Sequence, residues 1–131
     1  MPLQVDLVSP ERTLLSAEAS MVQARTLGGG DIAFLPGHAP FIAALDTWPV
    51  RITLTDGREE VAAVHGGFIE VSKDRVKILS DLAELAYHID AERARRAVER
   101  AEEASRREHD LEADAALKRA NARLQAVGQP L

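Results

Sequence analysis

The composition of the chain changes near Ile89, and this break limits the folds that it can adopt. Before the break, short alternating apolar runs are separated by turn residues. After it, alanine and paired charges dominate, with nine Arg or Lys against nine Asp or Glu, so the net charge of -5 falls within residues 1–88. A length of 131 residues suits one compact domain with an appendage. We therefore predict two units, residues 1–88 and residues 89–131.

The first unit has the period-two alternation of half-buried strands. The clearest runs are Leu3, Val5 and Leu7; Val22, Ala24 and Thr26; Ile52 and Leu54; and Val76 and Ile78. Turn signals separate the runs, and Asp56-Gly57 predicts a hairpin with a two-residue primed turn, because glycine adopts positive φ without steric cost. No segment before Ile89 offers the helix of a parallel crossover. We expect an antiparallel β-sandwich or flattened barrel.

The second unit is predicted to be an antiparallel helical hairpin. Asp90 can cap a helix beginning at Ala91, and a second helix is expected between Asp110 and Gly128. Each helix carries an apolar stripe that can face the other, Ala94, Ala97, Ala101 and Ala104 on the first and Ala113, Leu117, Ala120, Leu124 and Val127 on the second. An alanine buries about one methyl, worth about 0.8 kcal/mol, whereas ordering a residue costs about 1–2 kcal/mol. The hairpin should be marginally stable alone, which suggests a moving part.

Composition and motifs argue against several classes of function. A pI near 5.4 without a basic cluster argues against nucleic-acid binding, and without cysteine the chain cannot form disulfides or thiolate metal sites. Gly28-Gly29-Gly30-Asp31-Ile32-Ala33 matches a dinucleotide fingerprint in letters, but Phe34-Leu35-Pro36 follows where a helix must begin, so a turn is favoured. The four histidines are widely spaced and no serine lies in a nucleophile elbow, so we expect neither a metal site nor a catalytic one.

Several segments together resemble one known family. They are Leu7-Val8-Ser9-Pro10-Glu11-Arg12, Phe34-Leu35-Pro36-Gly37-His38-Ala39-Pro40, Gly66-Gly67-Phe68-Ile69-Glu70-Val71, Val76-Lys77-Ile78-Leu79-Ser80-Asp81 and Ala116-Leu117-Lys118-Arg119-Ala120-Asn121-Ala122-Arg123-Leu124. In this order and spacing the chain resembles the epsilon subunit of F-type rotary ATP synthase. The resemblance spans the chain and implies a sandwich of about ten strands followed by two antiparallel helices.

The resemblance also implies a function. Family members are non-catalytic rotor subunits: the sandwich binds the gamma subunit and the ring of c subunits, coupling proton flow to rotation. The hairpin can extend into the alpha/beta catalytic head and restrain ATP hydrolysis. A peripheral position on the cytoplasmic face of the bacterial membrane follows, without direct insertion. No cofactor is required, although ATP is a candidate regulatory ligand. A free-standing ligand- or nucleotide-binding sandwich is the alternative.

Interface residues are carried over from the resemblance position by position. His38 matches a position near the gamma-facing surface, although it can equally brace its turn. Asp31 matches an acidic loop position facing the c ring, or is an ordinary loop charge. The basic residues expected to meet the catalytic head are Arg106, Arg107, Lys118 and Arg119, and the alternative is a solvated helix face.

A nucleotide site is the remaining expectation. Ile89-Asp90-Ala91-Glu92-Arg93-Ala94 fits the pattern with which some bacterial family members bind ATP, and Arg100 lies seven residues after Arg93 on the same helix face. The predicted set is Ile89, Asp90, Arg93, Ala94, Arg100 and Arg123. The pattern is equally that of a simple helix start, in which Asp90 caps and Arg93 is an exposed helix former. Our hypothesis is that ATP holds the hairpin folded against the sandwich.

Overall fold

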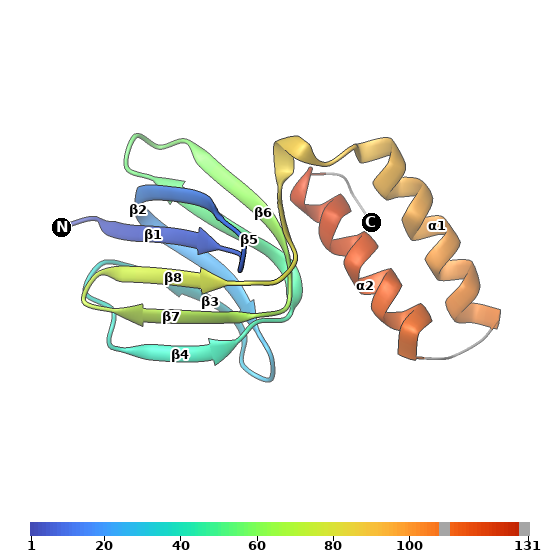
Figure 1. Cartoon of the computed structure of the whole chain (residues 1–131), viewed down its shortest axis with the longest axis horizontal. Coiled ribbons are helices and arrows are strands. Elements are labelled where there is room, and N and C mark those ends of the chain that lie inside the picture. The colour runs from blue at the N-terminus through green and yellow to red at the C-terminus, as the bar shows by residue number, and fades with distance from the viewer. Residues whose placement is uncertain (108–110, 129–131) are drawn as a thin grey trace.

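A computed structural model describes residues 1–107 and 111–128. Its strands are β1 (Leu3–Val8), β2 (Thr13–Thr26), β3 (Gly30–Phe34), β4 (Phe41–Ala44), β5 (Thr47–Leu54), β6 (Glu59–His65), β7 (Phe68–Ser72), β8 (Arg75–Leu79) and β9 (Ala83–Leu85). A 3-10 turn η1 (Ala86–His88) leads to α1 (Ala91–Arg107) and α2 (Leu111–Ala126). Figure 1 shows the two helices side by side at one end of the sandwich, with α2 between α1 and the strands. The predicted sandwich and helical hairpin are thus confirmed, with nine strands among the described residues.

The sandwich is one continuous sheet that folds over itself at β2. The strand order is β4-β7-β8-β1-β2-β5-β6-β9, with β3 also paired to β2. The first half of β2 pairs with β1, and its second half pairs with β5 on one edge and β3 on the other. The long strand therefore belongs to both layers, and the apolar core lies between them.

A register shift between Ala19 and Met21 makes this passage between layers possible. Before the shift an odd-numbered residue, Ala19, points into the core, whereas after it the even-numbered Val22 and Ala24 do so. An irregular pairing inserts a residue into one strand and reverses the face that later side chains occupy. Strict alternation alone would have placed part of β2 on the wrong face.

Two details of the predicted sandwich are wrong. β1 pairs in parallel with β8, its neighbour in the sheet. The two strands are far apart in the sequence, so the intervening strands connect them and no crossover helix is needed. The primed two-residue turn lies at Lys73-Asp74 between β7 and β8, where both residues have positive φ. The hairpin predicted at Asp56-Gly57 does form, between β5 and β6. Its turn differs from the prediction: only Gly57 has positive φ, and a hydrogen bond from Leu54 N to Arg58 O closes a three-residue loop.

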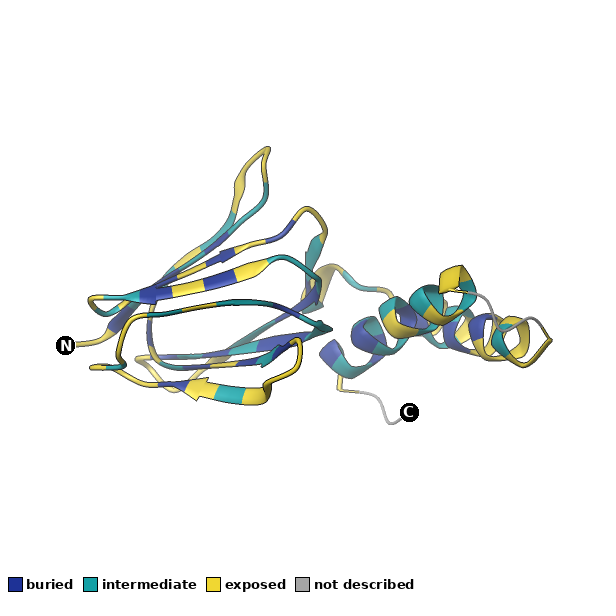
Figure 2. Cartoon of the chain, turned by 90° about the horizontal axis from the view of Figure 1, so that it is seen from below, coloured by how far each residue is buried: buried dark blue, intermediate teal, exposed yellow. Residues whose placement is uncertain are grey.

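The sandwich core contains large, fully buried side chains. The largest include Phe34, Leu3, Leu7, Ile52 and Ile78, none of them exposed to solvent. Figure 2 shows the buried residues alternating with exposed ones along the strands, as expected when one face of each strand points inward. At about 25 cal/mol per Å² of buried apolar surface, such side chains stabilise the fold by about 1.5–3 kcal/mol each.

The predicted start of the hairpin is confirmed. The Asp90 carboxylate accepts a hydrogen bond from the Arg93 backbone N–H at 3.1 Å, so Asp90 caps α1 and Ala91 is its first residue. At the other end, Gly128 has positive φ and its N–H donates to the Gln125 carbonyl, as expected just after a helix. The predicted start of the second helix at Asp110 and its predicted stop at Pro130 lie outside the described residues.

The two helices meet through a small apolar cluster. It comprises Ala94, Val98, Ala120 and Leu124, with Ile89, Ala97, Leu117 and Val127 packed against it. The predicted stripes are therefore mostly confirmed. Ala104 is exposed, so its place in the first stripe was wrong, and Val98 is a contact that the alanine pattern missed. The cluster is far smaller than the sandwich core.

Candidate functional site

A cleft of about 390 Å³ opens where β9, η1 and both helices meet. It is lined by Glu84, His88, Ile89, Asp90, Arg93, Ala94, Ala97, Arg100 and Arg123. All six residues of the predicted nucleotide set are among them. The volume lies within the range of small-molecule sites, roughly 300–1,000 Å³.

Helical geometry gathers the cationic groups of this cleft. Arg93 and Arg100 lie two turns apart on the same face of α1, and Arg123 reaches the cleft from α2. Three guanidinium groups, each with planar fork donors, are suited to phosphate oxygens. Two carboxylates, Asp90 and Glu84, line the same cleft, and Asp90 is partly engaged as the helix cap.

Glu84 was not predicted from the sequence. It lines the cleft and its carboxylate accepts two side-chain hydrogen bonds. Its Oε1 accepts a hydrogen bond from Arg123 Nε at 2.7 Å and another from His65 Nε2 at 3.1 Å. The bond from His65, followed by the bond and charge of Arg123, outweighs desolvation and lowers the pKa of Glu84 from 4.5 to about 2. Glu84 is therefore ionised at neutral pH and ties the sandwich to α2. No local motif marks it, because its partners lie 19 and 39 residues away.

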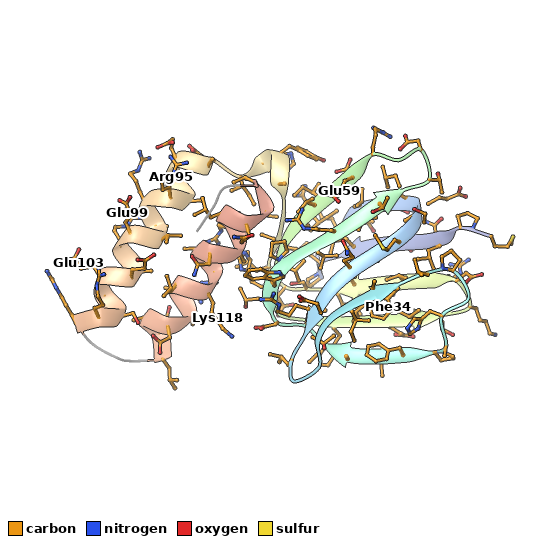
Figure 3. All side chains as sticks on the ribbon, turned by 180° about the vertical axis from the view of Figure 1, so that it is seen from behind. Phe34, Glu59, Arg95, Glu99, Glu103 and Lys118 are labelled. Carbon is orange, nitrogen blue, oxygen red and sulfur yellow. The ribbon has the colours of Figure 1, made fainter. Side chains whose placement is uncertain are left out.

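A second polar contact ties α2 to the sandwich. Lys118 Nζ donates to the Asp46 carboxylate at 3.1 Å, and Figure 3 shows Lys118 on the part of α2 that borders the sandwich. Two other predicted head-contact residues pair within the hairpin. Arg119 pairs with Glu112, seven residues earlier, at 2.9 Å. Arg107 pairs with Glu103 at 2.6 Å, as expected from a spacing of four. Arg106 is exposed in the last turn of α1. When the hairpin is docked, Lys118 is therefore paired with Asp46 of the sandwich.

His38 lies in the turn between β3 and β4. Its ring packs against Phe34 and Phe41, with centroids 5.0 and 6.1 Å away, and its Nδ1 donates to the Ala39 carbonyl at 2.7 Å. His38 is nevertheless partly accessible at the surface. The structure thus gives it a bracing role, and an interface role remains compatible with its position.

Asp31 lies near the start of β3 and is paired with Arg25. The Arg25 Nε atom donates to the carboxylate at 2.8 Å, and this hydrogen bond lowers the pKa of Asp31. About 69% of the Asp31 side chain is exposed. The pair is therefore a surface ion pair of small energetic weight, and Asp31 can still be reached by a partner.

An exposed apolar patch on the sandwich was missed by sequence reasoning. Phe68 and Leu79 are register partners on β7 and β8, and Ile42 lies on the same face of β4; all three are exposed, at 54%, 41% and 68%. We call these three residues the β4-β7-β8 patch. Phe68 and Leu79 are direct neighbours, and Ile42 lies diagonally across from Phe68, because its own register partner is Glu70. Single exposed apolar residues are common, whereas a group of them on one face is typical of an interaction surface. No signal in the sequence brings these three positions together, because the pairing of β4, β7 and β8 places them on one face.

Comparison with known proteins defines the class of this chain. Residues 2–86 match the model of the ATP synthase delta/epsilon chain, beta-sandwich domain. Two proteins named ATP synthase epsilon chain are similar over nearly the full length: that of Streptomyces griseus is 46% identical over 95% of this chain and 94% of its own, and that of Moorella thermoacetica is 45% identical over 96% of both. A chain in the cryo-EM structure of the Euglena gracilis mitochondrial ATP synthase has the same fold, with a TM-score of 0.82 at 22% identity over 95% of this chain and 80% of that one.

The chain therefore belongs to the ATP synthase epsilon-chain family, whose members are subunits of that complex. This confirms the resemblance found in the sequence and disfavours the alternative of a free-standing sensor. Among the described residues, neither helix is long and apolar enough to cross a membrane.

Proposed function

We propose that this chain is a non-catalytic subunit of the central stalk, coupling proton flow to rotation and restraining ATP hydrolysis through its two helices. The observation that carries the proposal is the contrast between a well-packed sandwich and a hairpin docked through few contacts. The chain then acts at the cytoplasmic face of the bacterial membrane, held there by protein partners.

The sandwich is proposed to bind the gamma subunit through the β4-β7-β8 patch and the turn at His38. Burial of Ile42, Phe68 and Leu79 in a complex would supply the apolar centre typical of a stable interface. We expect Phe68→Asp to weaken capture of gamma at least tenfold, whereas Leu111→Asp, at a similarly apolar but 90% exposed helical position, leaves capture unchanged. Equal capture by both variants would remove the patch from the interface.

Contact with the c ring is proposed at the β2-β3 turn, where Asp31 presents a carboxylate. Asp31→Asn retains the shape of the side chain but removes its charge and weakens its pairing with Arg25. We expect proton-driven ATP synthesis to fall in membranes carrying this variant, while binding of gamma is retained. Normal coupling in the Asp31→Asn variant would show that this charge is not part of the contact.

The hairpin is proposed to inhibit hydrolysis when it leaves the sandwich and meets the catalytic head. Lys118, Arg119, Arg106 and Arg107 supply positive charge for that encounter, and Lys118 must first part from Asp46. Deleting the residues after His88 should leave assembly intact and raise ATP hydrolysis. Hydrolysis that does not change after the deletion would mean that this hairpin does not inhibit.

The cleft is proposed to bind ATP as a regulatory ligand that favours the docked hairpin. The triphosphate would contact Arg93, Arg100 and Arg123, which come from both helices, so the ligand would hold them together. Calorimetry should detect binding that is lost in an Arg93→Gln/Arg100→Gln variant and retained in Arg96→Gln, a control on α1 that does not line the cleft. An absence of heat at millimolar ATP would remove this ligand from the account.

A further inference from the structure

The interface between α2 and the sandwich buries small side chains. α2 packs against β5 and β6. Ala122 and Ala126 of α2 are buried, and Ala63 of β6 is buried without belonging to the sandwich core. Methyl groups remove little apolar surface from water, so this face alone gives weak docking. Polar contacts must therefore contribute much of the specificity of the docked position.

Two described ion pairs join α2 to the sandwich, and both partners are partly buried in only one of them. The Lys118 and Asp46 side chains are 61% and 23% exposed, whereas Arg123 and Glu84 are 29% and 30% exposed. Solvent screens the first pair more strongly than the second. The contact between Arg123 and Glu84 is therefore the stronger candidate for holding the hairpin.

Behind Glu84 lies His65, whose side chain is only 3% exposed. A carboxylate can only accept hydrogen bonds, so His65 Nε2 carries the hydrogen that it donates to Glu84. The same oxygen, Oε1, accepts from Arg123. The Nδ1 atom of His65 is buried without a hydrogen-bond partner within residues 1–107 and 111–128. A buried polar atom without a hydrogen-bond partner costs free energy. This cost indicates that the orientation of the ring is set by the hydrogen bond from Nε2 to Glu84.

We propose that His65 is a positioning residue that holds the Glu84 carboxylate toward Arg123, forming a latch that docks the hairpin without any ligand. Glu84 lies in the short edge strand β9 and lines the cleft, so without a partner its side chain could adopt other rotamers there. The hydrogen bond from His65 restricts the Glu84 side chain to one orientation even when α2 is not docked. Arg123 then meets an acceptor that is already oriented and partly desolvated, so less entropy is lost when the hairpin docks.

The test measures docking directly in the full chain without nucleotide. Because the chain has no cysteine, Glu18→Cys on the sandwich and Glu99→Cys on α1, both exposed, can carry labels for a distance measurement. We expect His65→Leu to lower the ratio of docked to released hairpin about tenfold, in line with loss of an oriented charge-assisted contact. His65→Gln, which keeps an N–H donor near the position of Nε2, should lower it less than threefold. Equal docking of His65→Leu and the parent would overturn the proposal.

A double-mutant cycle separates positioning from a general effect of His65 on folding. Within the described residues, His65 and Arg123 share Glu84 as a hydrogen-bond partner, so the effects of His65→Leu and Arg123→Gln on the docking free energy, the logarithm of the docking ratio, should be strongly non-additive. His65→Leu and Lys118→Gln, which act at separate ion pairs, should be additive. If His65→Leu does not fold, His65→Asn, whose shorter amide cannot reach the position of Nε2, supplies the same cycle with Arg123→Gln. Additivity of the pair that shares Glu84 would contradict the latch.

This latch goes beyond the proposed regulation by ATP and can fail independently of it. If ATP does not bind, the docking ratio without nucleotide and its response to His65→Leu are unaffected. If the latch is wrong, ATP can still bind to Arg93 and Arg100 and raise the docking ratio. Measuring both quantities on the same labelled chain therefore distinguishes the two failures.

Discussion

The sandwich and the hairpin use different means to stay folded. The sandwich buries large side chains such as Phe34, Leu3 and Ile52 completely, whereas the hairpin closes over a cluster in which alanine predominates. The core of the sandwich is apolar and does not depend on ion pairs. The docking of the hairpin against the sandwich, in contrast, includes ion pairs of Lys118 and Arg123. Stability should therefore be high in the first unit and low in the second. This difference allows one unit to remain bound to a partner while the other moves.

The largest expected effect is in the sandwich core. Phe34→Ala removes a fully buried ring that also packs against Phe41, and should lower the free energy of unfolding by about 3–5 kcal/mol. Phe68→Ala, at a 54% exposed position, should change it by less than about 0.5 kcal/mol. Denaturant unfolding followed by strand circular dichroism measures both. Similar losses in the two variants would contradict the assignment of Phe34 to the core.

A truncation inside the hairpin should have a smaller and local effect. Leu124→Ala empties part of the helical cluster and should cost about 2–3 kcal/mol of hairpin stability, enough to melt the helices before the strands. Helical ellipticity should be lost at lower temperature, while amide exchange in β1 and β8 stays slow. Leu111→Ala, at a 90% exposed site, is the control. Loss of strand protection in Leu124→Ala would mean that the two units unfold together.

Acid should weaken the contact between the units. The pKa of Glu84 in the folded chain is lowered from 4.5 to about 2, so its stabilisation is complete above about pH 4.5 and disappears as the pH falls through about 2. Allowing for partial exposure, we expect about 1–2 kcal/mol. Glu84 faces its hydrogen-bond partners His65 and Arg123. The other titratable residues that line the cleft are His88, Asp90, Arg93 and Arg100.

The matched variant isolates this titration from all others. Glu84→Gln cannot ionise, so the stability difference between it and the parent should be largest near pH 7 and shrink between pH 4.5 and 2. Unfolding by denaturant at a series of pH values gives this difference directly. A difference that is constant across the acid range would show that Glu84 is not the titrating group.

The smallest effect is expected on the outer face of α1. Glu103 and Arg107 form an exposed pair, and Figure 3 shows Glu103 on the side of α1 away from the sandwich. Glu103→Gln should therefore cost less than about 0.5 kcal/mol and leave docking unchanged. A loss equal to that of Glu84→Gln would remove the distinction between the surface pair and the latch.

Sequence reasoning succeeded where the physical cause is local. Alternation identified strands, and the Asp90 cap and the seven-residue spacing of Arg93 and Arg100 follow from backbone periodicity. The same reasoning failed where a strand breaks the two-residue alternation, and where residues far apart in the sequence come into contact. The register shift after Ala19 and the meeting of Glu84 with His65 have no nearby signal, because both depend on how separate strands and helices pack.

Hydrogen exchange on the full chain, with and without ATP, tests the central claim most directly. We predict two classes of amide: those of the sandwich strands exchange only on global unfolding, whereas those of α1 and α2 exchange through a smaller opening that ATP makes rarer. His65→Leu should speed exchange in the helices and leave the strands unchanged. A single rate class, with helices protected as strongly as β1 and β8, would contradict a rigid sandwich carrying a releasable hairpin.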